Sequence, residues 1–222
     1  MAPDSTTQNP LPNIDFRIAT FLQSASNLGN APSDTGSEVA FAGRSNAGKS
    51  SAINTLTANR KLARTSRTPG RTQLINFFSL SDSQRLVDLP GYGYAKVPLK
   101  MKQEWNRHMA NYLQKRQSLR GLILLMDIRH PLTDADEQMI GWAATAQMPI
   151  HALLTKADKL KRGPAKATLL SVQGRLSEFG DLASVQLFSS LKGDGLPALR
   201  TKLKTWLTDD SVFDEPSLPE DQ

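Results

Sequence analysis

The sequence predicts an α/β domain with three layers, in which a mixed six-stranded sheet carries helices on both faces. Two observations lead to this prediction. From Glu38 onward, short apolar runs of strand length alternate with longer segments of helix length, as in sheets whose parallel strands are joined by helices. Between the second and third apolar runs lie only the residues 81–84, too few for a crossover, so we expect a hairpin and one antiparallel edge strand.

The expected strands are short and mainly apolar. They cover residues 39–42, 74–80, 85–88, 122–127, 150–155 and 185–189. The fourth is continuously apolar from Leu122 to Met126, which is typical of a strand covered on both faces. The expected helices cover residues 50–57, 99–116, 133–145, 164–179 and 196–207.

The first strand runs into a G-x-x-x-x-G-K-[ST] sequence, which indicates a phosphate-binding loop when a strand precedes it and a helix follows. Its residues are Gly43, Arg44, Ser45, Asn46, Ala47, Gly48, Lys49 and Ser50. The two glycines let backbone N–H groups turn toward phosphate oxygens at a helix N-terminus. We expect Lys49 to reach the β- and γ-phosphates and the Ser50 hydroxyl to bind Mg²⁺. The alternative is a chance glycine turn beside a lysine.

The third strand ends in a D-x-x-G sequence formed by Asp88, Leu89, Pro90 and Gly91. A carboxylate at this strand end can hold Mg²⁺ through water, and the Gly91 N–H can approach a γ-phosphate closely because no Cβ intervenes. Alone, such a sequence usually marks a plain turn. After a hairpin and downstream of a phosphate loop, it indicates a γ-phosphate contact.

The fifth strand is followed by a T-K-x-D sequence formed by Thr155, Lys156, Ala157 and Asp158. The Asp158 carboxylate can accept hydrogen bonds from guanine N1–H and N2–H₂, whereas adenine offers no such pair of donors. The Lys156 stem can lie along the base. The alternative is that Asp158 caps the next helix.

The last strand is followed by three residues whose backbone N–H groups can meet the guanine O6. They are Phe188, Ser189 and Ser190. By themselves these residues indicate only a turn at a strand end.

The segment 60–73 is polar, basic and broken by a Pro-Gly pair, so we expect it to be mobile without ligand. A threonine in it can bind Mg²⁺ and the γ-phosphate and thereby order the segment in the triphosphate state. Thr65, Thr68 and Thr72 are equal candidates by their chemistry. The basic side chains can instead contact RNA phosphates; they are Arg60, Lys61, Arg64, Arg67 and Arg71.

The two ends of the chain depart from the alternating pattern. Residues 1–36 are expected to form a partly disordered N-terminal extension, in which 14–22 is apolar enough to pack on the domain edge. The domain itself spans 37–207. The tail 208–222 contains six acidic and no basic side chains and is expected to be disordered.

Charge and composition narrow the class of protein. Without the acidic tail, the chain carries 27 basic and 15 acidic side chains. Such a basic body indicates a polyanionic partner, most commonly RNA, although a basic surface can also serve solubility alone. The lack of cysteine excludes disulfides and thiolate sites. No apolar run approaches the roughly 18 residues of a membrane span, and no secretory signal begins the sequence, so we expect a cytoplasmic protein without membrane insertion.

Taken together, the motifs resemble those of a P-loop GTPase domain of the Ras-like fold, and most closely the EngB (YihA) family of bacterial GTPases, related to TrmE, Era and the septins. The resemblance covers residues 15–207. Four runs carry it: G-R-S-N-A-G-K-S-S at 43–51, T-P-G-R-T-Q at 68–73, D-L-P-G-Y-G-Y-A at 88–95 and D-I-R-H-P-L-T-D at 127–134. The acidic tail is a feature outside this resemblance.

The resemblance implies roles for further residues. Thr72 becomes a Mg²⁺ ligand beside Ser50 and Asp88, and Lys49, Thr72 and Gly91 become the catalytic residues. A phosphate-sensing loop is implied at Gly70, Arg71, Thr72, Gln73 and Leu74.

Two positions bear on the rate of hydrolysis. Asn46 matches an asparagine with which related GTPases hold K⁺. Tyr92 stands where many GTPases carry a glutamine that orients the attacking water, and because an aromatic ring cannot polarise water, we expect slow intrinsic hydrolysis.

The resemblance implies a Mg²⁺-dependent, monomeric GTPase that binds GTP and GDP and acts as a slow switch in assembly of the large (50S) ribosomal subunit, linked to cell division and septation. A second hypothesis is a GTP-stabilised scaffold at the division septum that acts through protein partners. A third is a P-loop kinase or ATPase, which Asp158 disfavours.

Overall fold

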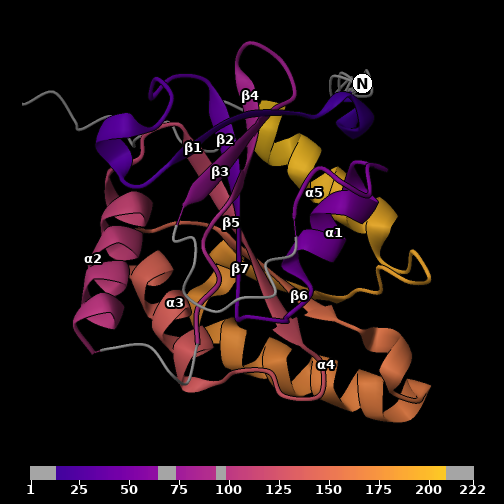
Figure 1. Ribbon diagram of the computed structural model, residues 1–222. Helices are drawn as coiled ribbons and strands as arrows, with labels where there is room; N and C mark the ends of the chain where they lie inside the picture. The colour runs from indigo at the N-terminus through magenta and orange to yellow at the C-terminus, as the bar shows by residue number, and fades with distance from the viewer. Residues whose placement is uncertain (1–13, 65–73, 94–98, 209–222) are drawn as a thin grey trace, which may run out of the picture.

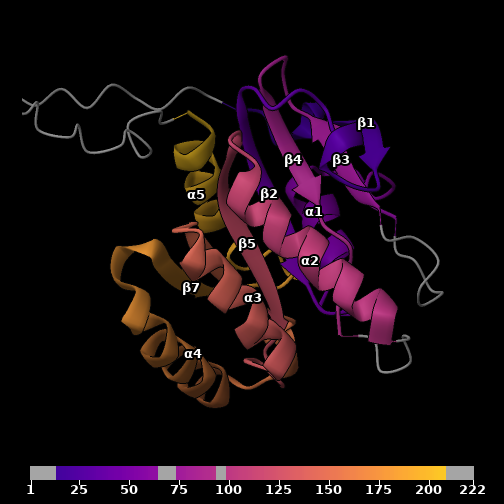
Figure 2. The same ribbon diagram turned by 90° about the vertical axis from the view of Figure 1, so that its left-hand side faces the viewer.

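The computed structural model of the protein describes residues 14–64, 74–93 and 99–208. In this part of the chain, a twisted sheet lies between two layers of helices, as the two views of Figures 1 and 2 show. The strands are β1 (Thr20–Ala25), β2 (Ser37–Gly43), β3 (Ile75–Ser79), β4 (Gln84–Asp88), β5 (Leu119–Asp127), β6 (Ile150–Thr155) and β7 (Ala183–Leu187). Their order in the sheet is β1-β3-β4-β2-β5-β6-β7.

The predicted α/β class, the mixed sheet and the β3–β4 hairpin are confirmed, but the strand count and the edge are corrected. The described sheet has seven strands, and β1 lies outside β3, so the antiparallel strand β3 is not at the edge. The sequence did not indicate β1 because its first three residues are all exposed and show no alternation. An edge strand pairs on one side only and needs no two-sided apolar run.

The five expected helices are confirmed, with ends within three residues of those predicted. They are α1 (Lys49–Leu56), α2 (Leu99–Lys115), α3 (Asp134–Thr145), α4 (Arg162–Leu176) and α5 (Leu196–Thr208). Short 3₁₀ turns occur at Phe16–Ile18, Leu28–Asn30, Ala157–Lys159 and Ser177–Leu182. None of the helices in the described ranges has the length and hydrophobicity needed to cross a bilayer.

Alternating side chains of the buried strands divide the interior into two cores. On one face of the sheet, Leu122 and Leu124 pack with residues of α2, α3 and α4. On the other face, Ile123 and Leu125 pack with α1 and α5. This alternation is that of a parallel sheet covered on both sides, and it confirms the three layers.

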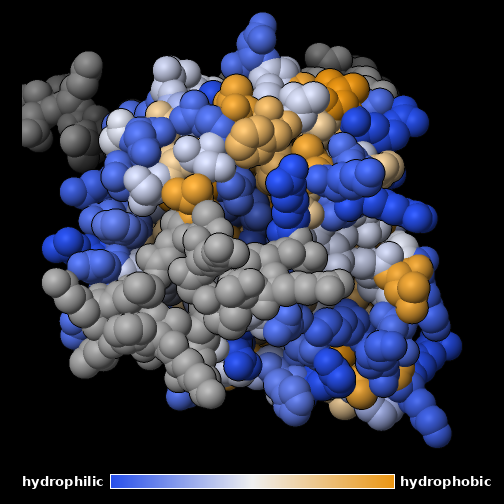
Figure 3. All heavy atoms as spheres, in the orientation of Figure 1, coloured by the Kyte–Doolittle hydropathy of each residue, from blue (hydrophilic) through white to orange (hydrophobic). Residues whose placement is uncertain are grey.

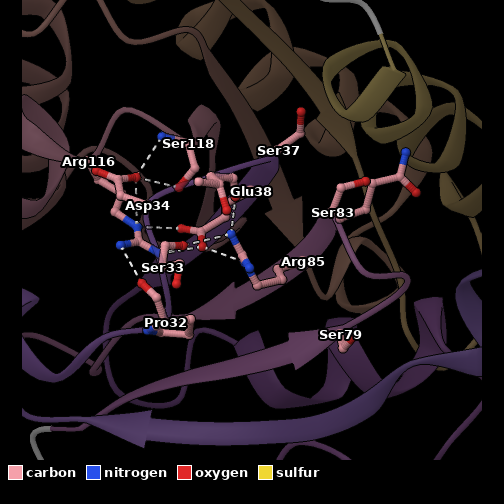
Figure 4. Close-up of polar contacts among 12 residues, drawn as sticks. Pro32, Ser33, Asp34, Ser37, Glu38, Ser79, Ser83, Arg85, Arg116 and Ser118 are labelled. Atoms are coloured by element: carbon pink, nitrogen blue, oxygen red, sulfur yellow. Dashed lines mark hydrogen bonds and ion pairs between the residues drawn. The ribbon is translucent and has the colours of Figure 1, made fainter.

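A buried ion cluster closes the amino-terminal ends of the central strands (Figure 4). The Glu38 carboxylate is fully buried and accepts hydrogen bonds from Arg85 Nε (2.7 Å), from Arg116 Nε (2.9 Å) and Nη2 (2.7 Å) and from the Tyr112 hydroxyl (3.1 Å). Arg116 Nη1 also donates to the Pro32 carbonyl (2.9 Å). Because every charge in the cluster is paired, its burial is tolerated, and the segment before β2 is fixed to the sheet.

The predicted N-terminal extension is in part integrated into the fold. Its described residues, 14–36, contribute β1 and two 3₁₀ turns along the sheet edge. Residues 1–13 and the tail from Asp209 lie outside the described residues.

Burial of His151 in β6 should make stability depend on pH. Burial, together with the charge of Lys202, lowers the pKa of His151 to about 4, while Ser184 and Gln186 bond its ring nitrogens. Between pH 6.5 and about pH 4, the His151 side chain is protonated in the unfolded chain but remains neutral in the folded chain. The free energy of unfolding should therefore fall by roughly 2–3 kcal/mol across this window.

Urea unfolding at pH 7 and pH 4.5 checks this expectation. His151→Gln should flatten the decline, whereas His108→Gln, at an exposed histidine, should leave it unchanged. An equal decline in all three proteins would contradict the role of His151.

Close packing of α5 on β5 depends on the absence of a side chain at Gly121. A Cβ built there lies 2.4 Å from Trp206 Cε3, inside the indole ring. Gly121→Ala should therefore push α5 outward and lower the free energy of unfolding by about 2–3 kcal/mol. Gly174→Ala in α4, where a Cβ meets nothing, should be neutral or stabilising. Denaturant midpoints of the two variants check the contrast, which equal midpoints would contradict.

Candidate functional site

A cavity of about 720 Å³ lies at the carboxyl ends of β2, β4 and β6. In sheets of this kind, ligands bind at that edge, and the size suits a small molecule. The predicted site residues that line it are Arg44, Ser45, Asn46, Gly48, Lys49, Ser50, Leu74, Asp88, Leu89, Pro90, Gly91 and Lys156.

The phosphate loop joins β2 to α1 in a tight turn that the glycines allow. A Cβ at Gly43 would lie 2.9 Å from the Leu125 carbonyl oxygen, so only glycine fits. Asn46 and Gly48 have φ values of 67° and 95°, in the left-handed region. Helix α1 then begins directly at Lys49, so the loop lies at a helix N-terminus, where anions are favoured.

Residues at the end of β6 hold the carbonyl oxygens of this loop. The buried Thr155 hydroxyl donates to Ala47 O (2.6 Å), and Lys156 Nζ donates to Asn46 O (2.7 Å). Lys156 Nζ also lies 2.9 Å from Asp127 Oδ2 at the end of β5. The base-recognition sequence and the phosphate loop are thus brought together, as predicted for one nucleotide site.

Asp127 was not predicted as a site residue. Hydrogen bonds from Arg129 and then Lys156 hold the pKa of its carboxyl well below the usual range. A carboxylate directly after the continuously apolar strand was the signal in the sequence that could have identified it.

At the other end of the site, Asp158 lies against the last loop. The hydroxyl of fully buried Ser189 donates to Asp158 Oδ1 (2.6 Å), and this hydrogen bond lowers the pKa of Asp158. The Ala157 N–H donates to the Phe188 carbonyl (3.1 Å), which ties the two loops together. Since Lys161 is the N-cap of α4, the alternative that Asp158 caps this helix is wrong.

The phosphate end combines a cation with oxygen ligands. Lys49 Nζ forms an ion pair with Asp88 Oδ1, and both side chains are nearly buried. The Ser50 hydroxyl lies 3.4 Å from the carbonyl of Arg64, which belongs to the predicted basic segment 60–73.

The residues present fit a Mg²⁺ ion. Ser50 and Asp88 line the same cavity with a hydroxyl and a carboxylate, which are hard oxygen ligands. The described residues contain no cluster of three or more acidic or histidine side chains. That is compatible with Mg²⁺ bound by few protein ligands together with phosphate oxygens and water.

Several predicted site residues cannot be placed. Thr72 and the other threonine candidates of 60–73 lie outside the described residues, as do Gly70, Arg71 and Gln73. Leu74, the last of the implied loop, lines the cavity.

Tyr92 does not face the cavity. Its side chain is 4% exposed, and its hydroxyl donates to Asp136 Oδ1 at 2.7 Å. The position that carries glutamine in many GTPases is therefore part of the core in this protein.

Comparison with known proteins agrees with this geometry. Residues 38–156 match the family described as 50S ribosome-binding GTPase. The chain is 56% identical over 205 residues to the probable GTP-binding protein EngB of Escherichia coli O1:K1 / APEC, covering 92% of this chain and 95% of the relative. For the protein of the same name from Escherichia coli strain K12, the identity is 56% over 203 residues, with 91% and 97% covered.

Solved structures share the fold. A crystal structure of a probable GTP-binding protein EngB superposes with a TM-score of 0.63 at 20% identity, covering 77% of this chain and 98% of its own. Era in complex with MgGDPNP and nucleotides 1506–1542 of 16S ribosomal RNA superposes with a TM-score of 0.59 at 22% identity, covering 85% and 61%. The closer relatives in sequence extend the likeness to nearly the whole chain, and the chain belongs to the EngB family of GTP-binding proteins, which are GTPases.

Proposed function

We propose that this GTPase is a slow, Mg²⁺-dependent switch in the assembly of the large (50S) ribosomal subunit, on which normal cell division and septation depend. The observation that carries the proposal is a basic turn, residues 60–64, that ends beside the nucleotide cavity. The description of the matching family, 50S ribosome-binding GTPase, supports the same partner.

In this proposal, the cavity holds the phosphates of GTP. Lys49 donates to β- and γ-phosphate oxygens, and the Gly91 N–H donates to the γ-phosphate. Ser50 and Asp88, with Thr72, would hold a Mg²⁺ ion, and this ion would supply positive charge against the phosphates. Water attacks the γ-phosphorus, the bond to the β-phosphate oxygen breaks, and GDP and phosphate leave.

Hydrolysis should be slow because Tyr92 supplies nothing that orients the water. Its hydroxyl is already donated to Asp136 in the core. A partner or a monovalent cation held at Asn46 would complete the site.

Guanine selection depends on Asp158. The hydrogen bond from Ser189 and the lowered pKa keep the carboxylate ionised and directed, so it accepts two hydrogen bonds from guanine. A base without those donors would leave this carboxylate desolvated and unpaired.

Asp158→Asn should therefore weaken GDP binding by roughly a hundredfold and improve the relative affinity for xanthosine diphosphate. Competition against a fluorescent GDP measures both affinities. Asp181→Asn, at an exposed aspartate in a 3₁₀ turn, is the matched control and should bind like the parent. An unchanged preference for guanine in Asp158→Asn, or displacement of GDP by ATP at equal concentration, would contradict the assignment.

The basic turn follows α1, and the Asn54 side chain makes three hydrogen bonds to its backbone. Asn54 Nδ2 donates to the carbonyls of Arg60 (3.1 Å) and Ala63 (2.9 Å), and its Oδ1 accepts from the Ala63 N–H (2.8 Å). The turn presents Arg60, Lys61 and Arg64 to solvent. Within the described ranges, none of these three forms an ion pair with a carboxylate, which leaves their charges available to RNA phosphates.

The basic turn lies next to the proposed nucleotide site. The Arg64 carbonyl lies by the Ser50 hydroxyl, and the predicted phosphate-sensing loop, 70–74, comes later in the same connection between α1 and β3. We propose that GTP and Mg²⁺ order that segment and so complete a basic surface for ribosomal RNA.

Co-sedimentation with large ribosomal subunits tests the switch. Binding should be at least tenfold tighter with a non-hydrolysable GTP analogue than with GDP, and it should weaken steeply between 50 and 200 mM salt, as expected for about three phosphate contacts. The triple variant Arg60→Glu, Lys61→Glu, Arg64→Glu should lose about tenfold or more in affinity.

A variant with the same change of charge on α4 is the control. Lys161→Glu, Arg162→Glu, Lys166→Glu reverses three exposed side chains far along the chain from the turn and should bind within about twofold of the parent. Equal binding with GTP analogue and GDP would contradict the switch. Equal losses in both triple variants would contradict the basic turn as the contact.

A septum scaffold that acts through protein partners is favoured by one feature only. Ile18, Phe21 and Leu22 at the β1 edge are 57%, 56% and 46% exposed. Figure 3 shows apolar residues on the face where β1 crosses the view. Midcell localisation that survives loss of ribosome binding in the Arg60/Lys61/Arg64 variant would favour this function.

A further inference from the structure

We infer that Tyr92 is a positioning residue for the γ-phosphate. It holds Gly91 and the outer turn of the phosphate loop in the arrangement that contacts GTP, and Asp136 holds Tyr92. This inference depends on the proposed roles of Gly91 and the phosphate loop in nucleotide binding.

The backbone of Tyr92 joins the D-x-x-G turn to the phosphate loop. The Ser45 N–H donates to Tyr92 O (2.9 Å), and the Tyr92 N–H donates to Gly43 O (3.4 Å). Gly91, whose N–H is proposed to meet the γ-phosphate, is the residue directly before. Any shift of Tyr92 therefore moves both Gly91 and Ser45.

Its side chain anchors this junction in the core. The Tyr92 hydroxyl donates to Asp136 Oδ1 (2.7 Å), and Asp136 is 1% exposed. Asp136 Oδ2 in turn accepts from the N–H (3.0 Å) and hydroxyl (2.7 Å) of Thr133, which caps α3. The Tyr92 ring lies 5.7 Å from the ring of Trp105 in α2, and Trp105 lies 6.1 Å from Trp142 in α3. The junction is thus fixed to two helices.

The hydroxyl donates to Asp136 and cannot act as a base here. Burial, and then the charge of Asp136, raise the pKa of Tyr92 well above its usual value, so the phenol keeps its proton. It neither accepts a proton from the attacking water nor faces the cavity. The Tyr92 side chain therefore affects the nucleotide only by fixing the position of its own backbone, which is joined to the phosphate loop.

Loss of the Tyr92 anchor should change the affinities for GTP and GDP by different factors. GDP has no γ-phosphate, so its affinity does not depend on the Gly91 N–H. Both nucleotides use the phosphate loop, but only GTP uses Gly91. A loosened junction should therefore weaken GTP binding much more than GDP binding. A general loss of stability would weaken both or neither.

The protein contains a matched control for a lost buried tyrosine–carboxylate hydrogen bond. The fully buried Tyr112 donates to Glu38 Oε2 (3.1 Å) in the ion cluster at the amino end of β2. Gly43 is the fifth residue after Glu38 along β2, which places this bond about 16 Å from the phosphate loop. Tyr112→Phe removes the same chemical group without touching the junction.

The experiment compares the full-length parent with Tyr92→Phe, Tyr112→Phe and Asp136→Asn. Dissociation constants for GDP and for a non-hydrolysable GTP analogue are measured with Mg²⁺, and each melting temperature is recorded. Tyr92→Phe should weaken the GTP analogue by about tenfold and GDP by less than about twofold. Tyr112→Phe should lower the melting temperature comparably and leave the ratio of the two constants unchanged.

Asp136→Asn keeps the shape of the partner and provides a second reading if Tyr92→Phe does not fold. Asparagine has a single side-chain oxygen, which would have to accept hydrogen bonds from both Tyr92 and Thr133. The variant should therefore change the ratio of the GTP-analogue and GDP dissociation constants in the same direction as Tyr92→Phe, by a smaller factor. An unchanged ratio in both variants, or an equal change in Tyr112→Phe, would overturn the inference. If the parent bound neither nucleotide, the proposed site would fail and the inference with it; normal parent binding with an unchanged ratio would overturn the inference alone.

Discussion

Two hydrogen bonds from the end of β6 to the phosphate loop are the interactions on which the nucleotide site depends. Thr155 and Lys156 bind the carbonyls of Ala47 and Asn46, and Asp158 follows two residues later. The distance between the carboxylate proposed to recognise the base and the N–H groups proposed to bind phosphate is therefore fixed through the end of β6. A nucleotide that satisfies one end must have the right length to satisfy the other.

The two ends of the sheet are built from different chemistry. At the amino end, Glu38, Arg85 and Arg116 are buried and paired with one another, and the two arginines also donate to backbone carbonyls. At the carboxyl end, the paired Lys49 and Asp88 line an open cavity, the proposed site of phosphates and Mg²⁺. The buried ion cluster therefore leaves no room for a ligand at the amino end. In the proposed function, Lys49 and Asp88 at the carboxyl end exchange their ion pair for contacts to the nucleotide.

The sequence was sufficient for much of the fold because its signals are local. Buried parallel strands are continuous apolar runs, and the phosphate loop needs glycine where a Cβ would meet the Leu125 carbonyl. The edge strand β1 left no such signal, since it is exposed on its outer side. Tyr92 shows a different limit: its motif gave its place in the chain, but only packing against Trp105 and Asp136 determines that the ring turns inward. The hydrogen bond from the Ser189 hydroxyl to Asp158 could likewise not be predicted, because a serine at a strand end has many possible partners.

The Trp206–Gly121 contact bears on the order in which the domain can form during synthesis. Gly121 lies in the central strand β5, and the indole that covers it comes from the last helix, together with Leu199 and Leu203. Until that helix has emerged from the ribosome, the apolar face shared with α1 stays open to water, and the support beneath the phosphate loop is incomplete. A nascent chain of this protein should therefore acquire its nucleotide-binding state in a single late step and not gradually as the strands appear.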